Sequence, residues 1–597
     1  MSNDLRELWL QMERKGRGDF LVGRDGSGSY RQLISIIETC CGIFDGHGLK
    51  FGDRVLIIVK DDFTASASFL AALLDGLVPV MLSPESRLAR IEAVARSTEA
   101  SLLISDDAVD CGHDCPRHVL NATIGGGVQA GTIRKLFRRK APANRVRAPQ
   151  CPDHASDQLA YILFTSGTTD RPNGVQITYG NLFSHLDTLC RLFEYDAQSR
   201  IFNATPLAHT DGLVQGPLLA AWSGAALVRP GPFQISDMEP WLNFIRSGGA
   251  THLIGNPTML TLIERLAEHR DYFDSAGFRG VISTGGILPE PVWKAFETGF
   301  GTNVWNVYGM TETVANALYA GTGAAFGAWG SIGRPVDCEA RLGNSNGQPL
   351  GDTEADEGEL QLRGANICAG YWRNPERTRK THLQDGWMRT GDLVRRRADG
   401  SFDFLGRLKS VINQGGMAIL PDEVDEALLR HPAVLEAVTV GLSDPEFEQI
   451  AVSAVVLNVP VSEASLTAHC RGYLEPLKMP KRIIQIETMP HTPSGKVDRQ
   501  ALGTCLTKRV QEPKVASVGN SGMGERIIEI ASGVFHVDRT LLTYASSPES
   551  IEGWDSFTHL NLILAVEDAL DIRIATPQIA AIRDIGSLVR IVEEARQ

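Results

Sequence analysis

Residues 54–77 of the chain read RVLIIVKDDFTASASFLAALLDGL. Residues 54–60 form an apolar run with a charge at each end, which is typical of a buried strand, and residues 65–77 have the length and composition of the helix that follows it. Further β-rich runs lie at 101–105, 225–229, 251–254 and 280–283, between helix-length amphipathic stretches. This alternation predicts an α/β architecture with parallel sheets, in which ligands bind beyond the carboxyl ends of the strands.

The composition is that of a globular protein with an acidic charge balance. The 597 residues include 58 Lys and Arg and 71 Asp and Glu, a formal net charge of −13. This balance argues against nucleic-acid binding, because phosphate contacts need clustered positive charge. The longest apolar stretch, residues 69–82, contains Asp75 and is shorter than the ~20 residues of a membrane-spanning helix. Residues 1–16 lack a signal-peptide pattern and the ten cysteines lack disulfide-like spacing, so we expect a cytoplasmic protein that binds no membrane.

Changes in composition divide the chain into one large and several small parts. Turn residues and Pro421, which can open a helix through Arg430, follow Gly406, and a polar stretch with Pro, Ser and Gly begins at Thr507. Helical patterns at 525–534, 557–570 and 585–595 predict a small helical bundle. The sequence therefore predicts an α/β multidomain chain with a large domain at 1–405, a small α+β subdomain at 406–506, a linker at 507–521 and a helical unit at 522–597.

A loop rich in hydroxyl groups follows the strand-like run 159–164. Residues 161–175 read YILFTSGTTDRPNGV. Small residues let the backbone approach an anion, and the N–H and hydroxyl groups of residues 165–170 can cradle phosphate oxygens. An ordinary turn is the alternative, because Ser, Gly and Thr are also turn residues. The loop is not a Walker loop, since the pattern G-x-x-x-x-G-K-[ST] is absent from it.

This loop and a series of later motifs, in the same order, resemble those of the adenylate-forming superfamily of acyl-CoA synthetases, luciferases and peptide-synthetase adenylation domains. The later motifs are Asn203–Leu213 (NATPLAHTDGL), Ser283–Pro289 (STGGILP), Asn306–Thr313 (NVYGMTET), Arg389–Leu393 (RTGDL), Gly406–Gly416 (GRLKSVINQGG) and Thr492–Asp498 (TPSGKVD). The resemblance implies that residues 1–405 form the core adenylation domain and residues 406–506 its mobile C-terminal subdomain. It also implies an enzyme that converts a carboxylic acid and ATP to an acyl-AMP.

The matching positions imply an ATP site and its catalytic residues. Those implied to bind ATP or AMP are Thr165, Ser166, Gly167, Thr168, Thr169, Gly285, Gly286, Asn306, Tyr308, Gly309, Thr311, Asp392 and Arg407. Glu312 would bind Mg²⁺, because a hard cation that bridges phosphates needs oxygen ligands. The Lys496 ammonium would bridge the substrate carboxylate and the α-phosphate, and His209 would act beside the acid. Lys409 would be the hinge about which the subdomain rotates after adenylation.

The phosphate loop departs from the family pattern at two positions. Asp170 and Asn173 stand where the family usually has Gly and Lys. The loss of the lysine removes a phosphate contact, and Asp170 adds negative charge near the triphosphate. We expect weaker ATP binding, because the backbone and hydroxyl donors remain. A degenerate homologue that binds nucleotide without turnover is the alternative.

Positions carried over from the motifs predict the pocket for the acid. Asp211 falls where amino-acid-activating domains bind the substrate ammonium, and the rest of the lining would be Gly212, Gln215, Ile254, Ile282, Thr284, Val307, Ala315 and Asn316. This small, partly polar lining differs from the apolar tunnel that a fatty acid needs. A buried, unpaired Asp211 would be costly, which favours a small amino acid over a short unsubstituted or hydroxylated acid. The alternative is that Asp211 is a loop carboxylate facing water, since Thr-Asp-Gly is also a turn sequence.

The carboxyl-terminal residues carry a further motif. Residues 552–560 read EGWDSFTHL and resemble the motif of acyl and peptidyl carrier domains, in which a serine bears 4′-phosphopantetheine. The resemblance implies that Ser556 is the modified residue and that its thiol arm meets the acyl adenylate at high effective concentration. An ordinary helix N-cap is the alternative reading of Asp-Ser.

The sequence thus predicts a ligase that uses ATP and Mg²⁺ to adenylate a small carboxylic acid and loads it onto its own carrier domain. Its partners would be the acid, a phosphopantetheinyl transferase, and downstream tailoring or assembly enzymes. One alternative is a ligase that releases the acyl group to free coenzyme A, with the tail as an interaction module. The other alternative, suggested by Asp170 and Asn173, is a nucleotide-binding scaffold without enzymatic activity.

Overall fold

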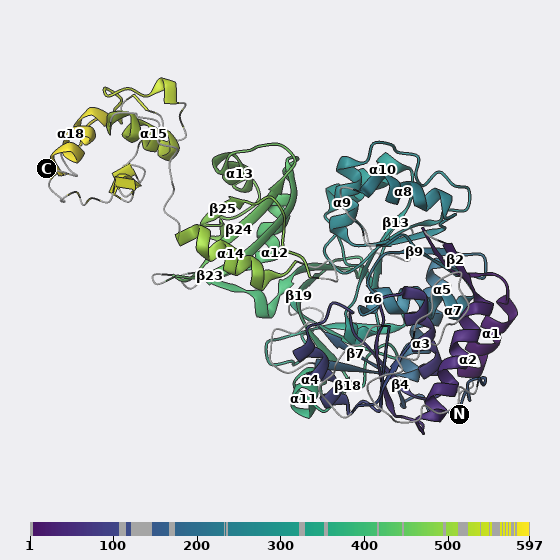
Figure 1. Ribbon diagram of the computed structural model, residues 1–597. Helices are drawn as coiled ribbons and strands as arrows, with labels where there is room; N and C mark the ends of the chain where they lie inside the picture. The colour runs from purple at the N-terminus through teal and green to yellow at the C-terminus, as the bar shows by residue number, and fades with distance from the viewer. Residues whose placement is uncertain are drawn as a thin grey trace, which may run out of the picture. The chain divides into compact units, whose positions relative to one another are not determined.

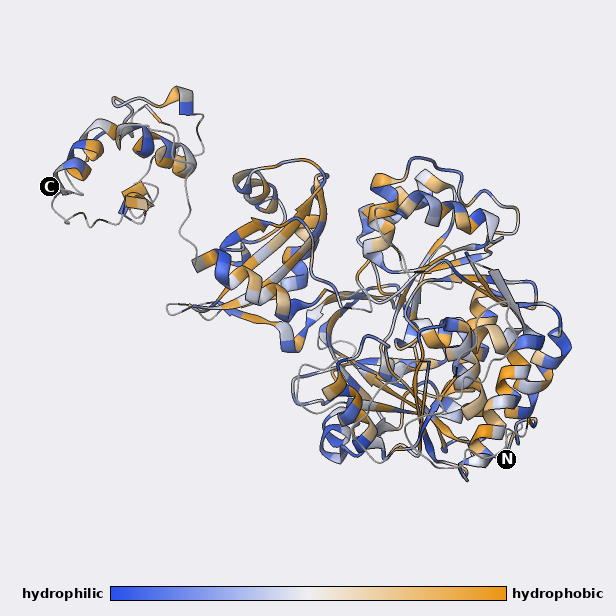
Figure 2. Cartoon of the chain, in the orientation of Figure 1, coloured by the Kyte–Doolittle hydropathy of each residue, from blue (hydrophilic) through white to orange (hydrophobic). Residues whose placement is uncertain are grey.

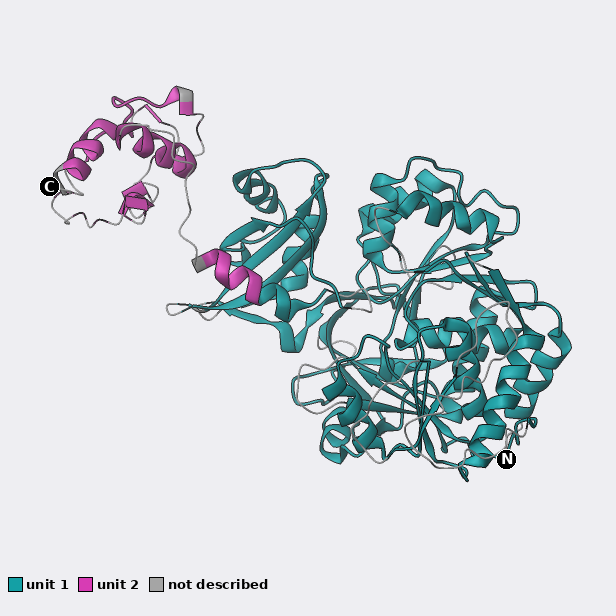
Figure 3. Ribbon diagram, viewed as in Figure 1, with its two compact units in different colours: residues 1–503 teal, residues 504–597 magenta. Residues whose placement is uncertain are grey.

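The computed structural model contains two compact units, residues 1–503 and 504–597 (Figure 3). It describes all residues except 1–3, 25, 107–114, 121–145, 166–172, 232, 234–236, 322–328, 352–355, 415–416, 445–446, 493–496, 512–522, 536, 538, 549, 552–553, 555–561, 564, 568, 571, 573, 575–577, 579–581 and 596–597. Each unit has a hydrophobic core of its own.

The strand predicted at residues 54–60 is central to a seven-stranded sheet. The order is β18 (Gly370–Tyr371), β8 (Asn173–Thr178), β7 (Leu159–Thr165), β4 (Val78–Met81), β3 (Arg54–Ile58), β5 (Leu102–Ser105) and β6 (Arg117–Val119). Strands β3 to β7 are parallel, whereas β8 is antiparallel to β7. The helix predicted at 65–77 is α3 (Asp62–Leu74), which starts earlier because the Asp61 side chain accepts a hydrogen bond from the Thr64 N–H and caps it.

A nine-stranded sheet contains the other predicted strands of this unit. The order is β15 (Arg334–Pro335), β14 (Leu318–Ala320), β13 (Val304–Tyr308), β12 (Gly280–Ser283), β11 (His252–Gly255), β9 (Arg200–Asn203), β10 (Ala226–Arg229), β1 (Asp19–Gly23) and β2 (Gly26–Ser29). The strands from β13 to β1 in this order run parallel. The runs predicted at 225–229, 251–254 and 280–283 are β10, β11 and β12, so the prediction of parallel sheets is confirmed.

Helices cover both faces of the nine-stranded sheet (Figure 1). On one face, Phe202 and Leu253 pack with Trp241, Leu260 and Phe296. On the other, alternate residues of the same strands join the core that is shared with the seven-stranded sheet, which explains the continuous apolar runs (Figure 2). The helices are α1 (Asp4–Lys15), α2 (Tyr30–Gly46), α4 (Leu88–Thr98), α5 (Tyr179–Phe193), α6 (Thr210–Leu213), α7 (Leu219–Ser223), α8 (Met238–Ser247), α9 (Pro257–Leu266), α10 (Glu290–Phe300) and α11 (Pro375–Thr381), with the short η1 (Val214–Leu218) and η3 (Thr311–Thr313).

Two smaller sheets complete unit 1. A four-stranded sheet has the order β16 (Cys338–Gly343), β17 (Glu357–Gly364), β19 (Met388–Arg396) and β20 (Phe402–Arg407). The short η4 (Leu408–Ser410) leads from it to a sheet of β22 (Met417–Ile419), β21 (Ile412–Gln414), β24 (Glu448–Leu457) and β23 (Val434–Asp444), with β25 (Arg482–Gln485) beside β24. The helices α12 (Pro421–Leu429) and α13 (Glu463–Cys470) and the short η5 (Pro476–Lys478) belong to this second part. Pro421 opens a helix as predicted, because its fixed φ suits the first helical turn.

Helix α14 (Arg499–Gln511) begins in unit 1 and ends in unit 2. It includes residues 507–511, which the sequence places in a linker; no Gly or Pro interrupts the chain between 504 and 511. The second unit contains α15 (Met523–Phe535), η6 (Arg539–Leu541) and α18 (Ile585–Ala595), and helices α15 and α18 match two of the predicted helical patterns. Its core includes Ile527, Trp554 and Leu588. Among the described residues, no helix is both long and apolar enough to cross a membrane.

Candidate active site

The residues predicted to line the acid pocket follow or end neighbouring parallel strands. The segment 205–215 follows β9, Ile254 and Ile282 lie within β11 and β12, Thr284 follows β12, and Val307 lies in β13. Because β9, β11, β12 and β13 are adjacent in the sheet, their carboxyl ends bring these residues to one edge. Ala315 and Asn316, which follow η3, are buried as well.

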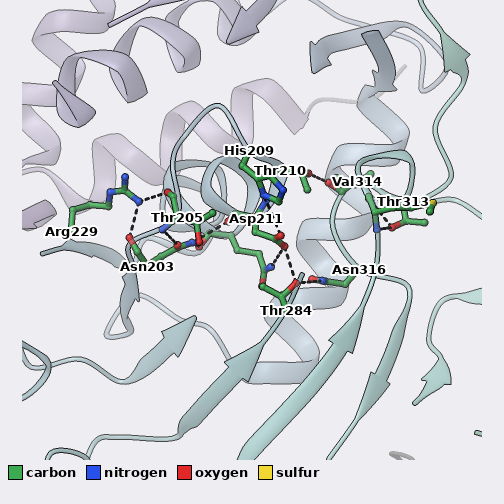
Figure 4. A network of polar contacts seen from close by, with 12 residues as sticks. Asn203, Thr205, His209, Thr210, Asp211, Arg229, Thr284, Thr313, Val314 and Asn316 are labelled. Carbon is green, nitrogen blue, oxygen red and sulfur yellow. Dashed lines mark hydrogen bonds and ion pairs between the residues drawn. The ribbon is translucent and has the colours of Figure 1, made fainter. Parts of the chain in front are cut away.

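Asp211 is buried rather than solvent-exposed, with 5% of its surface accessible. Its Oδ1 accepts hydrogen bonds from Gln215 Nε2 at 2.9 Å and Thr284 Oγ1 at 3.1 Å, and Asn316 Nδ2 donates to the same threonine oxygen at 3.5 Å (Figure 4). The alternative of a loop carboxylate facing water is therefore wrong. Asp211 instead anchors a polar network within the protein.

This network fixes the orientation of two amide groups. Because the carboxylate of Asp211 only accepts, Gln215 must direct its NH₂ toward it, and the Thr284 hydroxyl, which donates to Asp211, accepts from the Asn316 NH₂. The carbonyl oxygens Gln215 Oε1 and Asn316 Oδ1 are buried and have no hydrogen-bond partner among the described residues. A buried acceptor without a partner costs roughly 1–3 kcal/mol, so a donor placed beside either oxygen would stabilise the site.

His209 and Gly212 shape the segment that carries Asp211. The His209 Nδ1 caps α6 by accepting from the Asp211 N–H at 3.3 Å, and it also lies 3.3 Å from Asp211 Oδ2. A Cβ on Gly212 would lie 2.1 Å from the carbonyl oxygen of Pro206, so only glycine permits this close approach. Asn203 Nδ2 donates to the carbonyls of Asp211 (3.0 Å) and Gln215 (3.2 Å), which ties the segment to β9.

The turn between Glu312 and Asn316 is strained. Val314 has φ of +65°, a value that β-branched residues rarely adopt, and the hydroxyl of Thr210 donates to its carbonyl oxygen. A Cβ on Gly309 would lie 1.8 Å from the carbonyl oxygen of Ala315. The segment from 309 to 316 is thus folded back tightly, which brings Asn316 next to Thr284 (Figure 4).

The residues predicted to hold the nucleoside also lie together. Tyr308, at the end of β13, donates to Asp392 Oδ2 at 2.7 Å, and Arg407 Nε lies 3.3 Å from Asp392 Oδ1. Asp392 is 2% exposed, and burial raises its pKa against the opposing effects of Arg407 and then of the Tyr308 hydroxyl. Gly285 has φ of +84° and forms the turn after β12 with Gly286.

Asn306 presents an acceptor near these groups. Its Nδ2 donates to the carbonyl of Ser331 at 3.0 Å, which fixes the amide, and its Oδ1 is buried without a partner among the described residues. That oxygen has the chemistry needed to accept from the amino group of adenine.

Glu312, in η3, has a carboxylate suited to Mg²⁺. It is 9% exposed, and its Oε1 accepts a hydrogen bond from the Tyr371 hydroxyl at 2.6 Å. The described residues contain no group of three or more His, Cys, Asp or Glu side chains that could hold a metal. A single carboxylate fits Mg²⁺, which is commonly held by one or two carboxylates together with substrate phosphates.

Several predicted residues can be placed only in part. Thr165 ends β7 and is paired with the buried Asn173 at the start of β8, so both ends of the predicted phosphate loop are fixed. Lys409 lies exposed in η4, between the four-stranded sheet and β21, and Thr311 begins η3. The remaining predicted residues Ser166, Gly167, Thr168, Thr169, Asp170, Lys496 and Ser556 lie outside the described residues.

The structure adds residues that the sequence does not single out. Tyr371 contacts Glu312, and Arg90 Nη2 lies 3.3 Å from the carbonyl oxygen of Thr165. Tyr371 and Glu312 are 59 positions apart in the sequence, and Arg90 and Thr165 are 75 positions apart. No local spacing or composition signals such contacts, so only the three-dimensional structure reveals them.

Comparison with known proteins identifies the family of the chain. Residues 8–372 match the AMP-binding enzyme family and residues 423–496 match the AMP-binding enzyme C-terminal domain. A sulfoacetate–CoA ligase of Cupriavidus necator is 38% identical over 363 residues, 60% of this chain and 70% of that protein. An oxalate–CoA ligase of Arabidopsis thaliana is 32% identical over 483 residues, 79% of this chain and 92% of that protein.

A solved structure shares the fold. ATP-bound MatB from Rhodopseudomonas palustris superposes with a TM-score of 0.74 at 24% sequence identity, covering 86% of this chain and 100% of that one. The large N-terminal and small C-terminal domains are therefore those of the adenylate-forming fold. The chain belongs to the AMP-binding enzyme family, the adenylate-forming superfamily that includes acid–CoA ligases.

Proposed function

We propose that the protein adenylates a small carboxylic acid that carries a hydrogen-bond donor, an amino acid first, and transfers the acyl group to a pantetheine thiol. The observation that carries the proposal is the buried network around Asp211, which lies at the same sheet edge as Asn306 and Tyr308. The curated relatives named above are CoA ligases, which supports coenzyme A as the thiol.

The residues of the chain would contribute mainly by binding and orientation. Asp392 would accept from the ribose hydroxyls, and Asn306 would accept from the adenine amino group. Mg²⁺, held by Glu312 and the phosphates, would neutralise their charge. A carboxylate oxygen of the acid attacks the α-phosphorus, the bond to pyrophosphate breaks, and Lys496 would stabilise the charge between the two anions. The thiolate then attacks the acyl carbon and AMP leaves.

The acceptors around Asp211 define the class of acid. The proposal places an ammonium beside the negative charge of Asp211 and near Gln215 Oε1 and Asn316 Oδ1, two oxygens without a hydrogen-bond partner among the described residues. A second anionic group, such as sulfoacetate and oxalate carry, would be repelled by the same oxygens. The pocket therefore favours a small α- or β-amino acid over these acids.

Pyrophosphate exchange with a panel of acids tests this specificity. Small amino acids should support exchange in the wild type. Asp211→Asn should lower kcat/KM for them roughly 100-fold, because the substitution breaks the proposed buried pair between the Asp211 carboxylate and the substrate ammonium, at a cost of about 3 kcal/mol or more. The matched control is Asp274→Asn, which alters an exposed carboxylate of the same unit and should change nothing. Preference for oxalate or sulfoacetate, or an unchanged Asp211→Asn enzyme, would contradict the proposal.

A second candidate acceptor is the phosphopantetheine arm on Ser556. It is favoured by the C-terminal unit, which has its own helical core and lies beyond the residues that match the family. In this route a phosphopantetheinyl transferase primes the carrier unit, and tailoring or assembly enzymes receive the acyl group. We therefore propose a carrier role for residues 522–597 as the alternative to free coenzyme A.

Intact mass distinguishes the two thiols. The chain is incubated with a phosphopantetheinyl transferase and coenzyme A, separated from free coenzyme A, and then given ATP, Mg²⁺ and the acid. An acyl mass on the wild type that is absent from Ser556→Ala identifies the carrier route. Acyl-coenzyme A formed equally by both chains, when coenzyme A is added back, identifies the free thiol. Pyrophosphate release at background with every acid would instead support the scaffold alternative.

A further inference from the structure

The segment that contains Tyr371 is tied to the strand that leaves the predicted phosphate loop. Strand β18 pairs with β8, where Tyr371 lies opposite Val175. The N–H of Ala369 donates to the carbonyl of Gln176 at 3.0 Å, and the N–H of Trp372 donates to that of Gly174 at 2.7 Å. The backbone of Tyr371 is therefore held at a fixed place beside β8.

The same segment also holds Glu312. The N–H of Cys368 donates to the Glu312 carbonyl at 2.8 Å, and the Tyr371 hydroxyl donates to Glu312 Oε1 at 2.6 Å. Tyr371 is only 4% exposed, so water competes little for this bond. Both the backbone and the carboxylate of Glu312 are thus positioned by residues 368–371.

The ring of Tyr371 is itself restrained. The guanidinium of Arg377 lies 4.4 Å from the ring centroid, and Thr378 Oγ1 accepts from the Tyr371 N–H at 3.0 Å. A swing of the side chain to another χ1 rotamer would lose the Arg377 contact and the bond to Glu312 together. The hydroxyl therefore fixes the orientation of the Glu312 carboxylate through its Oε1.

We infer that Tyr371 is a positioning residue that orients the Glu312 carboxylate for the magnesium ion entering with ATP. This inference rests on the proposed metal-binding role of Glu312. Mg²⁺ demands near-ideal octahedral geometry, so a ligand held in one orientation binds it better than one that rotates. Loss of a hydrogen bond that orients a ligand typically weakens metal binding roughly 10- to 100-fold.

The test measures metal binding directly in Tyr371→Phe, which keeps the ring and removes the hydroxyl. Mn²⁺ replaces Mg²⁺ and is titrated by electron paramagnetic resonance in the presence of α,β-methylene-ATP, whose bridge between the α- and β-phosphorus atoms cannot be cleaved, so that no AMP is transferred. The Kd for Mn²⁺ should rise roughly 10-fold or more. Tyr319→Phe is the matched control, because Tyr319 is 1% exposed and its hydroxyl has no partner among the described residues.

Two further variants separate the possible outcomes. Glu312→Gln should weaken Mn²⁺ binding by itself, and adding Tyr371→Phe to it should cause no further loss, because the hydroxyl acts through the carboxylate. Arg377→Ala keeps the hydroxyl but frees the ring and should raise the Kd about twofold to fivefold, which tests the inference even if Tyr371→Phe does not fold.

The inference would be overturned if Tyr371→Phe bound Mn²⁺ with wild-type affinity, or if the effects of the two substitutions were additive in the double variant. If Tyr371→Phe does not fold, wild-type Mn²⁺ affinity in Arg377→Ala would overturn it. Those results would leave the proposed function intact. If Glu312→Gln instead bound Mn²⁺ as tightly as the wild type, the metal-binding role of Glu312, on which the proposed function depends, would be contradicted.

Discussion

We expect the ionisation of Asp392, the proposed ribose ligand, to couple nucleotide binding to pH. An ionised carboxylate accepts from both ribose hydroxyls, whereas a protonated one has fewer and weaker acceptor sites. Burial raises the pKa of Asp392, while Arg407 lowers it. Nucleotide affinity should therefore fall as the pH decreases through a pKa above the ordinary value of 3.8. Arg407→Gln removes the first opposing charge, so the loss of affinity should begin at a higher pH. Fluorescent-AMP titrations from pH 4 to 8 measure both midpoints.

Tyr308→Phe provides the control for this prediction. It removes the smaller opposing effect, so it should move the midpoint in the same direction by less than Arg407→Gln. A midpoint that moves to lower pH in Arg407→Gln would show that Arg407 does not lower the pKa of Asp392.

Single residues differ in how far the sequence could assign them. Tyr308 and Asp392 are 84 positions apart and form a hydrogen bond, and Asn306 lies two residues before Tyr308 in β13, so the fold brings these motif residues together as expected. The burial of Asp211 could not be read from its Thr-Asp-Gly context, which is also a turn sequence. It depends on the packing of α6 against Gln215 and Thr284, which no local pattern encodes.

The close approach of α6 to the loop before it depends on Gly212. The Cβ of Gly212→Ala would meet the backbone oxygens of Pro206 and Thr205 at 2.1 and 2.5 Å, and backbone atoms cannot move aside as a flexible side chain can. We expect a loss of about 1–3 kcal/mol in unfolding free energy and a raised KM for the acid, because Asp211 moves with the helix. Thermal unfolding and pyrophosphate exchange measure the two effects.

The control for this element is Gly277→Ala. Gly277 has open space where its Cβ would lie, so the substitution should leave both stability and KM unchanged. A Gly212→Ala chain with wild-type stability and KM would show that α6 tolerates a shift away from the loop.

At the scale of the whole molecule, the sequence predicts the layers better than the boundaries. Parallel strands buried on both faces give continuous apolar runs, so β3, β5, β10, β11 and β12 are visible without a structure. The end of α14 was not visible, because residues 507–511 are polar yet helical. Helix ends depend on a few capping and packing contacts, which the composition of a segment does not specify.

The separate core of the second unit predicts that it folds by itself. Residues 512–597 retain α15 and α18 and the buried residues Ile527, Trp554 and Leu588, so this fragment should unfold cooperatively, as followed by the fluorescence of Trp554. A chain of residues 1–511 keeps all of unit 1 and α14 and should retain pyrophosphate exchange at wild-type rates. Loss of exchange in the shortened chain would mean that adenylation needs the second unit, whereas retained exchange would restrict that unit to steps after the adenylate.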